Sequence, residues 1–100
     1  MSVYMSLRMT ADPEKVRQAT QENKDMFMAI SDRAKQQGCI HHTFASENGS
    51  VVVMDEWESR EAFQKFFESD EDIPKLMQQA GVTSQPEIHF YEPMRLGDEF

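Results

Sequence analysis

The residues of this chain that are best suited to chemistry are a histidine, an aspartate and a tryptophan near its middle. If the chain folds back at Asn48-Gly49, His42 lies opposite Asp55, and Trp57 follows two residues further along the same sheet face. A carboxylate beside an imidazole fixes its tautomer, which suits a general base, and an indole offers an apolar wall with one N–H donor. We therefore take His42, Asp55 and Trp57 as candidate catalytic residues.

A purely structural explanation of the same pair stands beside this one. His41 faces Glu56 on the other side of the hairpin, and cross-strand His–acid pairs commonly stabilise two paired strands. Adjacent strand residues point to opposite faces, so His41 and His42 cannot hold one metal ion together. With the single cysteine Cys39 and no glycine-rich nucleotide loop, we expect neither a metal nor a cofactor.

The hairpin that positions these residues is the clearest element of the sequence. Strand-like residues 39–46 and 50–58 flank Asn48-Gly49, which favours a two-residue turn with positive φ at both positions. This turn sets the register and places Ile40 opposite Trp57.

The residues before the hairpin predict a strand and one long helix. Apolar and polar side chains alternate over residues 3–9, which is typical of a strand with one apolar face. Asp12 is a good N-cap, Pro13 fits the first helical turn, and Gly38 ends the helix. One stripe of this helix faces the sheet and consists of Val16, Ala19, Asn23, Phe27, Ile30 and Ala34.

The residues after the hairpin predict a helix, a short helical turn and a last strand. Ser59 is a good N-cap for the helix, and the acidic run at residues 68–72 indicates a solvated surface bend. Pro74 opens the further turn, which Gly81 ends, and residues 86–91 form the fourth strand.

This order of elements predicts an α+β fold of the ferredoxin-like βαββαβ type, with a four-stranded antiparallel sheet in a single domain over residues 1–100. The helices suffice for one sheet face, but the sheet is apolar on both, since Val52 and Met54 point opposite to Trp57. We therefore expect a homodimer formed through the sheet face, with the charged tail at residues 93–100 wrapping the surface or the partner subunit.

The composition excludes some partners. The chain has 18 acidic and 10 basic residues, a formal net charge of -8 and no cluster of Lys and Arg, so nucleic acid is not an expected partner. No signal peptide and no apolar segment of membrane-spanning length is found, so we expect a cytoplasmic protein with no membrane partner.

The segment from Asp55 to Phe63 reads Asp-Glu-Trp-Glu-Ser-Arg-Glu-Ala-Phe. It resembles the antibiotic biosynthesis monooxygenase family of dimeric α/β-barrel proteins, in which a strand ending in Glu-Trp runs into a helix beginning Ser-x-Glu-Ala. The resemblance implies a homodimer with a cavity between each sheet and its helices, where the oxygenases oxidise phenolic or quinol-like aromatics with O₂ and no metal or flavin. The family tryptophan maps onto Trp57. Haem-degrading relatives carry a histidine in the following helix, where this chain has Phe66 and Phe67.

The first hypothesis is therefore that the protein is an enzyme, a cofactor-independent monooxygenase that acts on a small aromatic compound. His42 with Asp55 would deprotonate an aromatic hydroxyl, and Trp57 would stack on the ring. The expected substrate-binding residues are Asn23, Phe27, Phe44, Phe63, Phe66 and Phe67. One alternative is a non-catalytic homodimer that binds a small apolar or aromatic ligand or has a regulatory role. Another is a structural dimer whose core is filled by Phe and Met.

Overall fold

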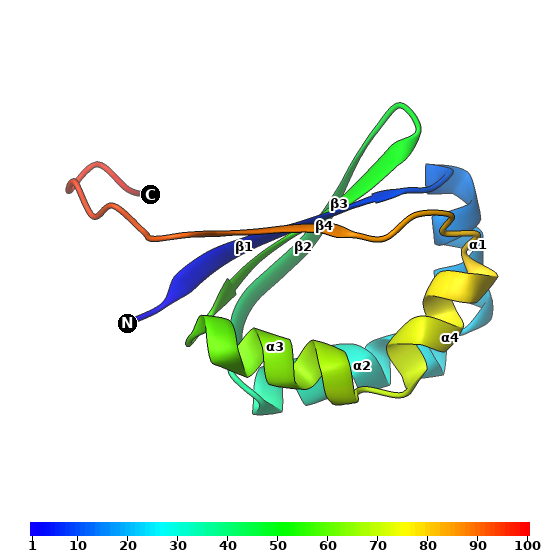
Figure 1. The fold of residues 1–100 in the computed structure, drawn as a ribbon, viewed down its shortest axis with the longest axis horizontal. Coiled ribbons are helices and arrows are strands. Elements are labelled where there is room, and N and C mark those ends of the chain that lie inside the picture. The colour runs from blue at the N-terminus through cyan, green and yellow to red at the C-terminus, as the bar shows by residue number, and fades with distance from the viewer.

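A four-stranded sheet with a layer of helices on one side makes up the computed structural model, which describes residues 1–100 (Figure 1). The strand order β2-β3-β1-β4, with every neighbouring pair antiparallel, is the predicted ferredoxin-like α+β fold. In chain order the elements are β1 (Val3–Thr10), α1 (Pro13–Glu22), α2 (Lys24–Gln36), β2 (Cys39–Glu47), β3 (Ser50–Trp57), α3 (Arg60–Ser69), α4 (Asp72–Gln79) and β4 (Glu87–Tyr91).

The core lies between the sheet and the helices. In the central strand β1, Met5, Leu7 and Met9 are buried, and the residues between them alternate toward the other face, as the two-residue period of a strand requires. The predicted cap of α3 is confirmed, because Ser59 Oγ accepts the N–H of Ala62 at 3.0 Å. None of the helices has the length and apolar character needed to cross a membrane.

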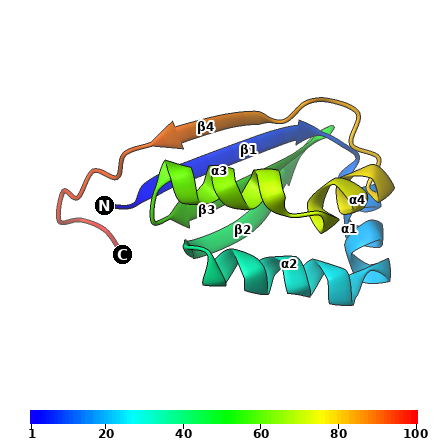
Figure 2. The ribbon, with the colours of Figure 1, turned by 60° about the horizontal axis from the view of Figure 1, so that its bottom comes forward.

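Asn23 divides the predicted long helix in two, so the expectation of one continuous helix was wrong. α1 ends at Glu22 and α2 begins at Lys24, since Asn23 has non-helical torsion angles (φ -119°, ψ 40°). The Asn23 amide donates to the carbonyl oxygen of Ala19 and to Oε1 of Gln79 on α4. Asparagine makes such local bonds in competition with helical geometry. Figure 2 shows α1 and α2 meeting at an angle, so that of these two helices only α2 runs along the sheet.

The acidic run at residues 68–72 is a bend with exposed side chains at Glu68 and Glu71, as its composition predicts, but the prediction was wrong for Asp70. Asp70 is buried after α3, where Arg33 of α2 donates to it through Nε at 2.7 Å and Nη2 at 3.1 Å. The backbone N–H groups of Asp72 and Ile73 also donate to Asp70. Burial acts to raise the pKa of Asp70, but these donors outweigh it and hold the pKa below its ordinary value. The Arg33–Asp70 pair therefore ties α2 to the junction of α3 and α4.

The hairpin of β2 and β3 has the predicted register over most of its length. His42 lies opposite Asp55, and His41 lies opposite Glu56. The turn differs from the expectation, because only Gly49 has a positive φ, at 77°. Glycine adopts this positive φ without the steric strain that a Cβ atom would cause.

The start of β2 departs from the predicted register. A bulge between Cys39 and His41 places Cys39 opposite Trp57, where the sequence predicts Ile40. The extra residue turns Cys39 toward the helix side and leaves Ile40 exposed. A bulge is invisible to a period-two pattern, since the pattern assumes one residue per step on each strand.

No helix covers the second face of the sheet, as Figure 1 shows, and large side chains on it are exposed. Among them are Tyr4 on β1, Met54 on β3 and Tyr91 on β4. The residues after β4 extend beyond the end of the sheet, and Arg95 there donates to the Tyr4 hydroxyl at 3.0 Å.

Candidate functional site

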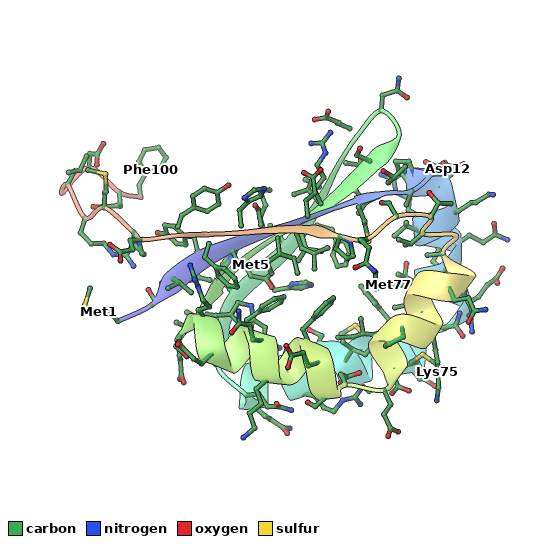
Figure 3. All side chains as sticks on the ribbon, viewed as in Figure 1. Met1, Met5, Asp12, Lys75, Met77 and Phe100 are labelled. Atoms are coloured by element: carbon green, nitrogen blue, oxygen red, sulfur yellow. The ribbon has the colours of Figure 1, made fainter.

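A cavity of about 370 Å³ lies between the sheet and the helices. It is lined by 26 residues, of which 20 are hydrophobic, so it suits a mainly apolar ligand. Figure 3 shows the side chains that project between the sheet and the helices and line this cavity, with Met5 on the sheet side and Met77 on the helix side. Methionines on both walls let a cavity adapt its shape, because the thioether side chain is flexible.

The fold brings together all but one of the site residues predicted from the sequence. The lining includes His42, Asp55, Trp57, Phe27, Phe44, Phe63, Phe66 and Phe67. Asn23 is not among the lining residues, and its amide is engaged by Ala19 and Gln79 at the corner between α1 and α2. Asn23 therefore shapes the helix layer and does not face the cavity.

A chain of two hydrogen bonds joins the three candidate catalytic residues. His42 Nδ1 lies 2.7 Å from Asp55 Oδ1, and the indole N–H of Trp57 donates to Asp55 Oδ2 at 2.9 Å. Asp55 is buried, and its two oxygens take one donor each. Two charge-assisted bonds of this length fix the carboxylate in a single orientation.

The His42 imidazole has one nitrogen left for other chemistry. An ionised carboxylate only accepts hydrogen bonds, so in the neutral imidazole the proton lies on Nδ1 and Nε2 keeps its lone pair. The side chain is 36% exposed and stands edge-on to Phe44, with 5.2 Å between the ring centroids. His42 therefore presents a proton acceptor at the accessible part of the cavity, while Asp55 holds the ring from behind.

The Trp57 ring has less freedom than the sequence suggests. It is 1% exposed and packs against Phe63 and Phe66 at centroid distances of 5.4 and 5.5 Å. Its single donor is used by Asp55. Asp55 and Trp57 are two residues apart on one strand and share a face, a spacing that could have indicated this bond.

Several cavity residues were not foreseen from the sequence. Ser31 and Lys35, one helical turn apart on α2, line the cavity. Thr20 of α1 also lines it. Cys39 lines it as a result of the bulge, and burial first, then the charge of Asp55, raise the pKa of its thiol to about 11. No three His, Cys, Asp or Glu side chains converge closely enough to hold a metal ion.

Fold and site together define a class: small ferredoxin-like domains that enclose an apolar cavity between the sheet and its helices. The sequence profile of one such family, described as antibiotic biosynthesis monooxygenase, matches residues 2–71. The chain belongs to this family. No curated protein matches it.

Solved structures agree with this fold at low sequence identity. A conserved protein from Methanosarcina mazei superposes with a TM-score of 0.67 at 20% identity, covering 94% of each chain. SnoaB, a cofactor-independent oxygenase from Streptomyces nogalater, gives 0.64 at 17% identity over 98% of each chain. The ActVA-Orf6 monooxygenase of Streptomyces coelicolor, in complex with nanaomycin D, gives 0.65 at 16% identity over 93% of this chain and 88% of that one.

Proposed function

We propose that this protein is a cofactor-independent monooxygenase that acts on a small aromatic compound of the phenol or quinol type. The observation that carries the proposal is the Trp57–Asp55–His42 hydrogen-bond chain, which ends at a free imidazole nitrogen in the wall of an apolar cavity. The family supports it, since SnoaB is a cofactor-independent oxygenase and the ActVA-Orf6 protein is a monooxygenase with nanaomycin D bound.

The reaction begins with proton transfer to His42. Nε2 accepts the proton of an aromatic hydroxyl, and the Asp55 carboxylate stabilises the imidazolium that forms. The resulting phenolate is rich in electrons at the ring carbon para to its oxygen. The surrounding apolar side chains keep bulk water from that carbon while O₂ reacts there.

The substrate supplies all the electrons that the reaction needs. A new C–O bond forms at the para carbon and the O–O bond of dioxygen breaks. The hydroxyl hydrogen and the hydrogen of that ring carbon leave with the second oxygen atom as water, so a phenol and O₂ give a para-quinone and H₂O. Four electrons pass from the ring to O₂, and no external reductant takes part.

We also propose that the protein works as a homodimer formed through the uncovered sheet face. Met54 and Tyr91 on that face are 45% and 53% exposed, and nothing in the chain covers them. The segment after β4 lies at the same face and adds the exposed side chains of Met94 and Leu96. A second copy would bury these apolar groups, which a small domain otherwise leaves in water.

Oxygen uptake by the metal-free protein tests the enzymatic proposal, with anthrones and 1-naphthols as the substrate panel, because the carbon para to their oxygen carries the hydrogen that the reaction removes. We expect His42→Ala to lower uptake by about 10²- to 10⁴-fold, the usual contribution of a general base. Gln36→Ala is the control, because Gln36 is exposed at the end of α2 and lies outside both the cavity and the uncovered sheet face. Unchanged uptake in His42→Ala would contradict the mechanism. Ligand binding without any uptake would favour the non-catalytic binding protein.

A further inference from the structure

Of the two charged side chains Asp55 and Lys35 in the cavity lining, only Asp55 has partners within the protein. Asp55 is the one acidic residue in the lining, and it already has two donors. Lys35 is the one lysine or arginine in the lining, and it pairs with none of the acidic side chains of the chain. The cavity lining therefore contains one positive charge, the Lys35 ammonium group, that forms no ion pair within the protein.

Lys35 lies at the accessible side of the cavity. It occupies the last turn of α2, only four residues before Cys39 begins β2, and the N–H of Gly38 bonds to its carbonyl oxygen. Lys35 and the nearby lining residues Ile40 and His42 are exposed. In contrast, the lining residues of β1 are buried, and so are Phe63 and Phe66 of α3. The cavity thus has a polar mouth between α2 and β2 and an apolar interior.

We infer that the ligand of this cavity is an amphiphilic anion, with an apolar ring body inside and a carboxylate at the mouth beside Lys35. The apolar lining supplies most of the contact area but does not distinguish one ring from another. An ammonium group at the mouth selects a carboxylate and orients the ring relative to His42. Ser31, one turn before Lys35 and also in the lining, offers a hydroxyl donor to the same group. The inference names the substrate class for the proposed oxygenase site and rests on that site's cavity.

Two probes that differ in charge and by one methyl group test this inference: a hydroxynaphthoate and its methyl ester. Trp57 is the only tryptophan and lines the cavity, so its single indole N–H resonance reports binding in an NMR titration. The titration is run without oxygen, so that no turnover consumes the probe. A failure of oxygen uptake would then contradict the proposed function and leave the binding result intact.

We expect Lys35→Gln to weaken binding of the acid about fivefold, as for a partly exposed ion pair, and to leave the ester unchanged. Lys35→Arg should keep the affinity for the acid. The matched control is Lys24→Gln, which removes a charge from the same helix outside the cavity. The inference is overturned if Lys35→Gln affects both probes equally or neither, if Lys24→Gln has the same effect as Lys35→Gln, or if the wild-type protein binds neither probe.

Discussion

At the scale of single residues, the main role of Trp57 is to hold the Asp55 carboxylate in place through its indole N–H. Its N–H donates to Asp55, and its ring is enclosed by Phe63 and Phe66. The tryptophan thus supports the carboxylate that in turn orients His42. Trp57 is best described as a positioning residue, because it acts on the proposed chemistry through Asp55.

Replacing the indole tests this role. We expect Trp57→Phe to destabilise the fold by about 2 kcal/mol, because a buried carboxylate loses one of its two donors. Urea unfolding measures the loss. In an Asp55→Asn background the same substitution should cost clearly less, since the charged bond is already gone. Equal costs in the two backgrounds would show that Trp57 contributes packing alone.

Cys39 offers a second test at this scale. Burial and the neighbouring Asp55 charge raise the pKa of its thiol to about 11, so the thiolate is scarce at neutral pH. We expect iodoacetamide to alkylate Cys39 at pH 7.5 at least roughly 100-fold more slowly than in the urea-unfolded chain. Asp55→Asn should speed the reaction, because it removes one cause of the shift. Equal rates in folded and unfolded protein would contradict this placement of Cys39.

At the scale of elements, the Arg33–Asp70 pair joins α2 to the junction of α3 and α4, and these helices form the cavity wall opposite the sheet. The pKa of Asp70 is lower in the folded state than its ordinary value. The pair therefore stabilises the fold fully above the unfolded pKa, near 4, and this stability is lost as the pH falls through the lower folded value.

The corresponding prediction concerns Asp70→Asn. We expect a loss of about 2 kcal/mol in the free energy of unfolding at pH 7, limited by the partial exposure of Arg33. The difference from the wild type should shrink as the pH falls through the lowered folded pKa of Asp70, because the carboxyl group is then protonated. Denaturant unfolding across this pH range measures both effects. Asp32→Asn is the control, since Asp32 is exposed on α2 and forms no ion pair; an equal loss there would argue against the Arg33–Asp70 link.

At the scale of the whole molecule, the uncovered sheet face is the surface through which we propose that two copies associate. We expect Met54→Glu to shift the proposed dimer to monomer, because it places a charge in the centre of that face. Light scattering coupled to size exclusion measures the mass. Met28→Glu is a matched control, since Met28 is an equally exposed methionine on α2. A monomeric wild-type protein at micromolar concentration would contradict the dimer.

The local features of this fold were readable from the sequence. Ser59 caps α3 as predicted, and the two-residue loop at Asn48-Gly49 pairs His42 with Asp55. Both depend on residues close in the chain, where capping chemistry and the two-residue period of strands act directly. The His–Asp part of the candidate site was predictable for the same reason.

Only the tertiary structure decided the features that depend on distant polar groups. Asn23 ends one helix and meets Gln79, 56 residues away, and Asp70 is buried because Arg33 reaches it across 37 residues. The unpaired position of Lys35 at the cavity mouth is of the same kind. Apolar periodicity specifies which face of an element turns inward. It does not specify which polar groups from separate elements then meet, because that depends on how the packed elements are placed in space.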